Sequence, residues 1–309
     1  MAEERTFKVF EQLRGRNNKT GIPGGKWYTW SGQSRDLLHA LNEIANDLPG
    51  PVLVEFGNGE YDYSLDNSCY AALLPALESR LKKFGDALHH IHIPPSIMLL
   101  TDLLPCGVSS RSLYLLFASA RSIVVRLTGD PRSAIFAPLG LNRETGNAER
   151  AEQGEHPLHS DLYPPALLLN VFDNVPNDGS GASLFLAKDS FAEIVRSLRS
   201  IPKHIGNAML ECLDRSVNKD QYDYFFDLLH GDHPWTRELE DAIERRAYVV
   251  RFSRGEGYFL CDRVWLHGRT TLSGHVPTNR LHRLIFDNVD TFAKRQRMSG
   301  VRPGRRKRK

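Results

Sequence analysis

The chain has 309 residues, of which 41% are hydrophobic and 25% charged, and its formal net charge is +3 at pH 7. This is the composition of an ordinary globular protein, and it excludes collagen-like, coiled-coil and disordered chains. No apolar run approaches the ~20 residues that span a bilayer, and the charged segment Met1 to Arg14 does not resemble a secretory signal. The four cysteines form no Cys-x-x-Cys pair. The sequence therefore predicts a cytoplasmic protein with reduced thiols.

Basic residues gather at the C-terminus, in residues 295–309. A block of like charges repels itself, so this segment is predicted to be a disordered tail. It could make non-specific contact with nucleic acid, or simply aid solubility as a solvated tail. Without the tail the chain is slightly acidic, which argues against a nucleic-acid-binding body. The expected partner is a small-molecule substrate, with no membrane span.

The N-terminal third is predicted to be mainly helical. Ser34 to Leu48 carries apolar residues at helical spacing, and Pro49-Gly50-Pro51 ends the pattern. Cys69 to Phe84 repeats it. From about Ser110 the pattern changes to short β-like runs, and strands are predicted at Ser122–Leu127 and Ala134–Phe136.

The second half predicts strands on both sides of a polar helical block at residues 188–245. The strands expected there are Leu167–Phe172, Ser183–Leu186, Tyr248–Phe252, Gly257–Leu260, Val264–His267 and Arg280–Phe286. This order favours a mainly β fold with α additions, a double-stranded β-helix or jelly-roll barrel with flanking helices and a helical lid insertion. One domain is expected over residues 1–294. It comprises a helical part at about 26–105 and a jelly roll at about 110–290, interrupted by the insert at 188–245 and followed by the tail at 295–309.

His159-Ser160-Asp161 is a His-x-Asp triplet at the start of the β-rich half. Residues i and i+2 of a strand point to one face, so the imidazole and the carboxylate can converge on one point. With a second histidine they would form the two-histidine, one-carboxylate set that leaves open positions on non-haem Fe(II). The triplet alone is weak evidence, because His-Ser-Asp also occurs in turns and helix caps.

The segment from Gly255 to Thr270 supplies the second histidine, His267, within Leu-His-Gly-Arg. It resembles the distal-histidine segment of the taurine dioxygenase, clavaminate synthase and γ-butyrobetaine hydroxylase group of Fe(II)/2-oxoglutarate oxygenases. The match is full at Leu266-His267-Gly268-Arg269 and partial at the preceding corner, Cys261-Asp262-Arg263, where the group carries an Asp-Asn-Arg-like turn. The resemblance covers roughly residues 155–287. It implies that His159, Asp161 and His267 hold iron, with 2-oxoglutarate and O2 as co-substrates.

The resemblance also implies an arginine for the distal carboxylate of 2-oxoglutarate, about a dozen residues after His267. Arg280 lies 13 positions on and is favoured by spacing. Arg283 lies 16 positions on and has the opposite strand parity, so only one of the two can point inward. Ser183 resembles the group's hydroxyl next to that carboxylate, or is a turn serine in a Gly-rich loop. The second arginine of many relatives is replaced by Leu284.

The activity implied is hydroxylation of an unactivated C–H bond in a small polar, amino-acid-like metabolite or natural-product intermediate, with release of succinate and CO2. A carboxylate at Asp161 favours hydroxylation, desaturation or ring closure over halogenation, which uses a small residue there. Two alternatives stay open. One is a cupin-type hydrolase or isomerase with another metal, and the other is a non-catalytic ligand-binding barrel.

Overall fold

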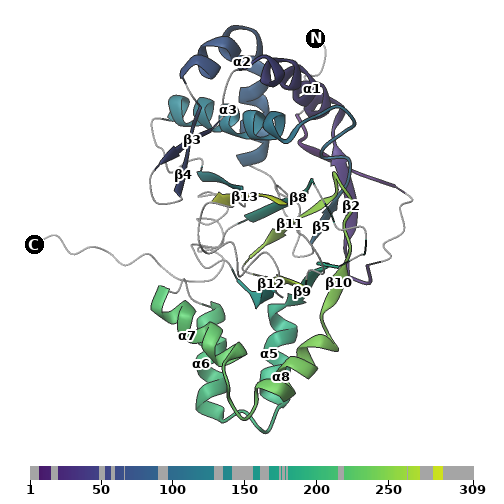
Figure 1. Ribbon diagram of the computed structural model, residues 1–309, viewed down its shortest axis with the longest axis vertical. Coiled ribbons are helices and arrows are strands. Elements are labelled where there is room, and N and C mark those ends of the chain that lie inside the picture. The colour runs from purple at the N-terminus through teal and green to yellow at the C-terminus, as the bar shows by residue number, and fades with distance from the viewer. Residues whose placement is uncertain are drawn as a thin grey trace, which may run out of the picture.

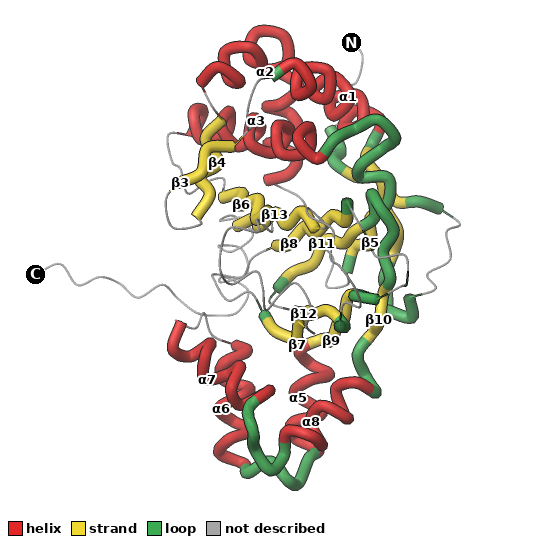
Figure 2. The backbone as a smooth tube through the Cα atoms, viewed as in Figure 1, coloured by secondary structure: helices red, strands yellow, loops and turns green. Residues whose placement is uncertain are grey.

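The computed structural model describes residues 7–14, 20–48, 53–56, 60–65, 67–89, 97–128, 135–140, 156–160, 167–173, 175, 178, 180–214, 219–262, 264–271 and 281–287. Helices and sheets are stacked in layers, so the described chain is a mixed α/β structure (Figures 1 and 2). None of the described helices is long and apolar enough to cross a membrane.

Two sheets form the middle of the molecule. The larger has seven strands in the order β1-β2-β5-β11-β8-β13-β6 and the smaller has four in the order β10-β9-β12-β7. The strands of the larger sheet are β1 (Phe10–Gln12), β2 (Lys26–Trp30), β5 (Met98–Leu100), β6 (Ile135–Gly140), β8 (Leu167–Phe172), β11 (Gly257–Cys261) and β13 (Leu281–Asp287). Those of the smaller sheet are β7 (His156–His159), β9 (Ser183–Ala187), β10 (Tyr248–Val250) and β12 (Trp265–Arg269). A separate hairpin joins β3 (Leu53–Phe56) to β4 (Glu60–Leu65).

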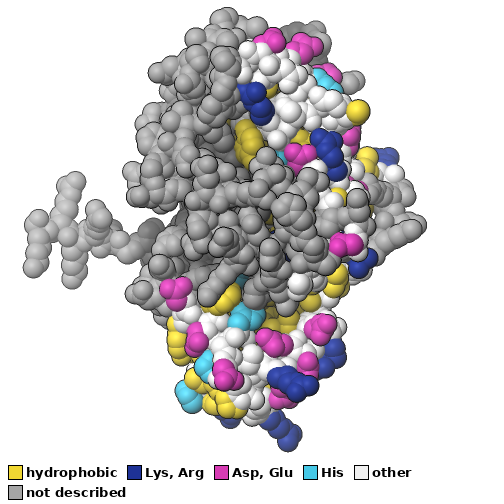
Figure 3. All heavy atoms as spheres, in the orientation of Figure 1, with side chains coloured by type: hydrophobic (Ala, Val, Ile, Leu, Met, Phe, Trp, Pro, Cys, Tyr) yellow, Lys and Arg dark blue, Asp and Glu magenta, His cyan; other side chains and the backbone are white. Residues whose placement is uncertain are grey.

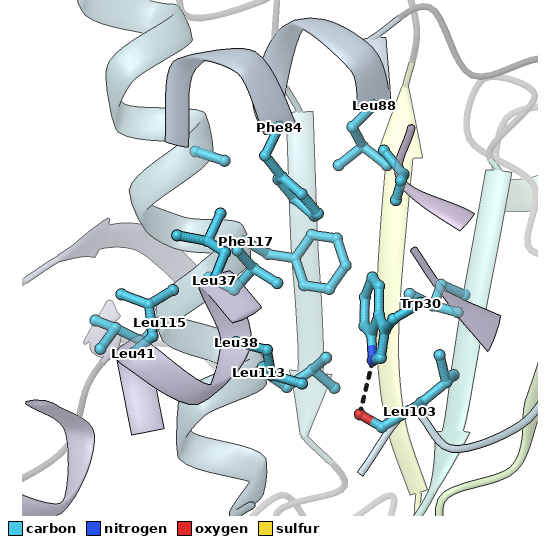
Figure 4. Close-up of a cluster of buried hydrophobic side chains, with 14 of the residues drawn as sticks. Trp30, Leu37, Leu38, Leu41, Phe84, Leu88, Leu103, Leu113, Leu115 and Phe117 are labelled. Carbon is cyan, nitrogen blue, oxygen red and sulfur yellow. Dashed lines mark hydrogen bonds between the residues drawn. The ribbon is translucent and has the colours of Figure 1, made fainter. Parts of the chain in front are cut away.

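Three helices cover the outer face of the larger sheet: α1 (Gly32–Asp47), α2 (Asn67–His89) and α3 (Ser110–Thr128) (Figure 1). Helix α1 begins where Ser31 accepts a hydrogen bond from the Ser34 amide, as N-cap serines do. Its apolar stripe packs with Phe84 and Phe117 around Trp30, whose indole N–H donates to the Leu103 carbonyl at 3.1 Å (Figure 4). These side chains bind the N-terminal helices and the larger sheet into one core.

The side chains of the larger sheet alternate between its two faces, and each face contributes to a different core. On β11, Phe259 and Cys261 pack under the helices. Tyr258 and Leu260 point the other way, into a core shared with Phe185 and Trp265 of the smaller sheet. Successive side chains of a strand face opposite sides, so the two sheets lie face to face with this core between them. We call the volume between them the inter-sheet space.

A third layer covers the outer face of the smaller sheet. It consists of α5 (Lys188–Ser197), α6 (Lys203–Asp214), α7 (Lys219–His230) and α8 (Thr236–Glu244), which agree with the helical insert predicted at 188–245. Their core takes in Leu158, Leu186 and Leu266 from the smaller sheet. Figure 3 shows acidic, basic and histidine side chains interleaved on the described surface of these helices.

The prediction of a strand at Ser122–Leu127 is wrong, because these residues belong to helix α3. The β-branched run Ile123-Val124-Val125 suggested a strand by propensity. However, Leu113, Leu116, Phe117, Ala120 and Ile123 recur at helical spacing and are all buried. Burial of this stripe in the core under α1 and α2 outweighs the local preference. The prediction at Ala134–Phe136 lies at the start of β6, whose first described residue is Ile135.

The N-terminal part at 26–105 is helical only in part, because β2, β3, β4 and β5 also lie in it. The six strands predicted in the second half correspond to β8 to β13, with ends that differ by a few residues. The short strands β1, β2 and β5 were not predicted. Three- and five-residue strands give little periodicity, and these depend on the pairing of β5 with β11.

Candidate metal centre

Two histidines far apart in the sequence meet on neighbouring strands of the smaller sheet. His159 on β7 and His267 on β12 are direct register partners. Their ring centroids lie 4.5 Å apart, and both residues are buried, with 3% and 1% of their surface exposed. Burial of two imidazoles side by side brings two nitrogen donors to one place, which is a common arrangement for transition-metal ligands.

The strands aim both rings at the inter-sheet space. His267 follows Leu266, which packs in the core of α5–α8. On β12 it shares its face with Trp265, which packs between the sheets. On β7 the residue before His159 is Leu158, which also packs in the insert core. The two histidines therefore lie on the inner face of the smaller sheet, beside apolar side chains such as Trp265.

Asp161 and Arg280 lie outside the described residues, as does the segment between β12 and β13 at 272–280. Within the described part of the chain no group of three or more His, Cys, Asp or Glu side chains is placed to hold a metal. The structure thus brings together the two predicted histidine ligands, and the predicted carboxylate ligand follows His159 by two residues.

A buried carboxylate that was not predicted as a site residue lies beside the histidines. Asp262 occupies the turn between β11 and β12, and one of its oxygens, Oδ1, lies 3.5 Å from His267 Nε2. The other, Oδ2, accepts a hydrogen bond of 2.7 Å from Ser160 Oγ. Lys188 Nζ donates in turn to Ser160 Oγ at 3.0 Å. A chain of polar contacts therefore runs from the start of α5 to His267.

Ser183 and Arg269 face each other across β9 and β12. Ser183 is 4% exposed and shares its face of β9 with Phe185, so the alternation directs it into the inter-sheet space. Arg269 follows His267 by two residues and lies on the same face of β12. The register irregularity at this point falls on the β7 side, since the pairing of β12 with β9 is continuous. From the sequence, Arg269 was named only as part of the Leu-His-Gly-Arg motif. Its spacing of two residues from His267 on a strand could have indicated that it shares the face of that histidine.

Strand β13 passes beside β8 with Arg283 opposite Asn170. Asn170 is fully buried, and its face of β8 is shared with Leu168 and Phe172, which pack between the sheets. Position 283 follows Leu281 by two residues and so shares its face of β13, and Leu281 packs against that same core. By register, position 283 therefore belongs to the inter-sheet face of the larger sheet.

His282 lies on the opposite face of β13 and links that strand to Tyr114 of α3 and to Asp173. Its Nδ1 contacts the Tyr114 hydroxyl of α3 at 2.5 Å, and its Nε2 lies 3.2 Å from Asp173 Oδ2. Arg254 Nε donates to the other oxygen of Asp173 at 3.1 Å. The hydrogen bond from His282, helped by the charges of His282 and Arg254, holds the pKa of Asp173 below its usual range, against the opposing effect of burial.

His230, at the end of α7, touches the backbone of the site. Its Nε2 lies 3.4 Å from the Leu158 carbonyl, next to His159. Burial lowers the pKa of His230 and is only partly offset by that hydrogen bond and by Glu240. A neutral His230 that donates to Leu158 ties the helical insert to the strand that carries His159.

No protein-family model matches the chain, and no curated protein sequence matches it. Solved structures do. The asparagine oxygenase AsnO is 14% identical with a TM-score of 0.39, over 84% of this chain and 91% of AsnO. The non-heme iron oxygenase OrfP, solved with Fe, is 13% identical with a TM-score of 0.38, over 90% of this chain and 97% of OrfP. The PvcB protein from Pseudomonas aeruginosa is 12% identical with a TM-score of 0.35, over 90% of each chain.

AsnO has also been solved with Fe(II), 2S,3S-3-hydroxyasparagine and succinate. OrfP has also been solved with Fe, succinate and (3S)-hydroxy-L-Arg.

Proposed function

We propose that the protein is a non-haem Fe(II)- and 2-oxoglutarate-dependent oxygenase that hydroxylates a small polar, amino-acid-like metabolite. The observation that carries the proposal is the register pairing of His159 with His267, two buried imidazoles on the inner face of the smaller sheet. They come from the two segments that resemble the metal-binding motifs of one oxygenase group. That coincidence of motif and geometry is not expected of two unrelated core histidines.

The donor set fits iron. Two imidazoles and one carboxylate suit Fe(II) that must keep positions open for a co-substrate and O2. In the proposal His159, Asp161 and His267 are the ligands. When bound, iron, 2-oxoglutarate and O2 together supply the oxidation of a C–H bond, with succinate and CO2 as the by-products. The chain's own part is to bind and orient the substrate and to exclude water from the inter-sheet space.

An arginine is proposed to pair with the distal carboxylate of 2-oxoglutarate, because its planar fork matches a carboxylate. Spacing favoured Arg280, and the register of β13 supports Arg283 instead, since position 283 lies on the inter-sheet face opposite Asn170. Ser183 is proposed as the neighbouring hydroxyl, which its burial on the inner face of β9 supports.

The two face-to-face sheets are proposed to be the walls of a jelly-roll barrel within a single domain at 1–294, followed by the basic tail at 295–309. The common core of the N-terminal helices and the larger sheet supports a single domain. The insert α5–α8 is proposed as a lid that influences substrate choice. A cytoplasmic location stays a prediction from the sequence.

The test begins with anaerobic protein, Fe(II) and 2-oxoglutarate. We expect a weak visible charge-transfer band when 2-oxoglutarate is added to the iron-loaded protein, and a chelator should lower the melting temperature of the loaded protein. His159→Ala should abolish the band, while His204→Ala, an exposed histidine on α6, should leave it unchanged. Iron binding without any band, in a folded protein, would favour a metalloenzyme of another kind. No iron binding would favour a non-catalytic barrel.

The two arginines are compared by titrating 2-oxoglutarate into Arg283→Met and Arg280→Met. Loss of the carboxylate partner should weaken binding by at least tenfold in one variant only. An effect confined to Arg280→Met would restore the assignment based on spacing. Succinate release is then measured with a panel of free amino acids, and the substrate is the compound that makes succinate formation keep pace with hydroxylated product.

A further inference from the structure

Asp262 occupies an unusual place for a turn residue. The Cys261 carbonyl accepts a hydrogen bond from the Val264 amide at 2.9 Å, which closes a tight turn between β11 and β12. Side chains of such turns normally point to solvent, yet Asp262 is only 3% exposed. Burial of a carboxylate is unfavourable unless nearby donors compensate for the lost water. Its surroundings should therefore show what its burial achieves.

The compensation comes from the two segments that carry the proposed iron ligands. Ser160 Oγ donates to Asp262 Oδ2 at 2.7 Å and also lies 3.2 Å from the Asp262 carbonyl. Ser160 is the middle residue of the triplet that begins with His159. On the other side, Asp262 Oδ1 lies 3.5 Å from His267 Nε2. Within the described residues Oδ1 accepts no hydrogen bond, so the His267 ring is the polar group that it faces.

Lys188 supports this arrangement from the insert. It is the first residue of α5, where the helix dipole favours an acidic residue over a basic one. Its backbone amide donates to the Val264 carbonyl of the same turn at 2.8 Å, and its Nζ donates to Ser160 Oγ. A cation at this unfavourable position is explained by the buried carboxylate beyond Ser160.

Backbone pairing alone does not fix the spacing of the two histidines. β7 and β12 are in register at His159 and His267, but the register shifts before Arg269 pairs with His156. At such an irregularity the hydrogen-bond ladder is locally disrupted, and β7 is the edge strand of its sheet. The contacts of Asp262 with Ser160 and with His267 add a side-chain link between the two strands.

We infer that Asp262 is a positioning residue, whose carboxylate holds the His267 imidazole and, through Ser160, the end of β7 that carries His159 in the relative placement that binds iron. The inference rests on the proposed function. It also gives a role to the corner at which this sequence departs from the Asp-Asn-Arg-like turn of the group it resembles. Partners of metal-binding histidines commonly change metal affinity by 10–100-fold when they are removed.

The test measures affinity for Fe(II) alone, by anaerobic competition with a chromogenic chelator, in Asp262→Asn and Ser160→Ala. Asp262→Asn keeps the shape and removes the charge, and we expect its Fe(II) affinity to fall about 10–100-fold. Ser160→Ala should lose less, since it leaves Oδ1 beside His267. The matched control is Asp173→Asn, a partly buried carboxylate that also contacts a histidine but on the helix-covered side of the larger sheet. It should leave Fe(II) affinity unchanged even if it lowers stability.

The outcomes separate this inference from the proposed function. Wild-type protein that binds no Fe(II) contradicts the proposed function itself. Wild-type binding with equal affinity in Asp262→Asn and Ser160→Ala overturns the role of Asp262 alone. If Asp262→Asn abolishes binding while Asp161→Asn retains it, Asp262 is itself a ligand, and the positioning role is wrong. Ser160→Ala gives a second measurement should Asp262→Asn fail to fold.

Discussion

Gly257 begins β11, the strand that leads into the Asp262 turn and on to His267, and it leaves no room for a side chain. A Cβ at this position would lie 1.9 Å from the Asn170 carbonyl oxygen and 3.1 Å from the Val171 Cα. The closest approach that real Cβ atoms make is about 3.0 Å. The obstacle is backbone on the neighbouring strand β8, so it cannot be relieved by turning a side chain.

Gly257→Ala should therefore push β11 away from β8 by about 1 Å. Such a shift breaks the hydrogen bonds that flank this position, from the Phe172 amide to the Glu256 carbonyl at 2.9 Å and from the Gly255 amide to the Phe172 carbonyl at 2.7 Å. Two lost bonds that leave buried groups unsatisfied cost about 3–5 kcal/mol. We expect a lower urea midpoint and a fall in Tm of roughly 5–15 °C.

The matched control is Gly32→Ala. Gly32 is the first residue of α1, and a Cβ there meets nothing within 4 Å. Alanine at an unstrained helical position should be neutral or stabilise by up to about 1 kcal/mol. Equal urea midpoints for Gly257→Ala and wild type would refute the close approach of β11 to β8.

Two further predictions concern the helix-covered side of the larger sheet. The pKa of Asp173 is lowered in the folded state, so its ionised form stabilises the fold above its unfolded pKa of about 4, and this stabilisation is lost as the pH falls through the folded value. Urea midpoints of wild type should drop below roughly pH 4, and Asp173→Asn should flatten that decline; an unchanged slope would contradict the ion pair. Trp30→Phe removes the indole donor to Leu103 and leaves a small cavity, so circular dichroism should detect a loss of about 2–3 kcal/mol. A midpoint within error of wild type would show that Trp30 is not packed as described.

The sequence predicted the elements whose pattern is long and local. The helices at Ser34–Leu48 and Cys69–Phe84 and the strand Leu167–Phe172 correspond to α1, α2 and β8. The helical insert was visible for the same reason. The prediction of a strand within α3 was wrong because it relied on a short run of β-branched residues. The buried apolar stripe that defines the helix extends over a longer span.

The candidate site was predictable only where a motif carried it. His159 and His267 were singled out by their segments, and their register pairing is a fact of the sheet that no local pattern contains. Asp262 was missed as a functional residue because turn aspartates are ordinarily exposed. Its burial depends on Ser160 and Lys188, which are distant in sequence. The face of β13 to which position 283 belongs likewise follows from the pairing with β8, which no local pattern contains.

The strands that present His159 and His267 to the inter-sheet space rest their other face on the core of α5–α8, through Leu158 and Leu266. A change of packing inside the insert is therefore a change beneath the histidines. In evolution, the exposed face of the insert can vary freely, whereas its core must change together with β7, β9 and β12. An engineer who grafts this insert between related proteins should transfer those three strands with it, because the insert and the smaller sheet share one core.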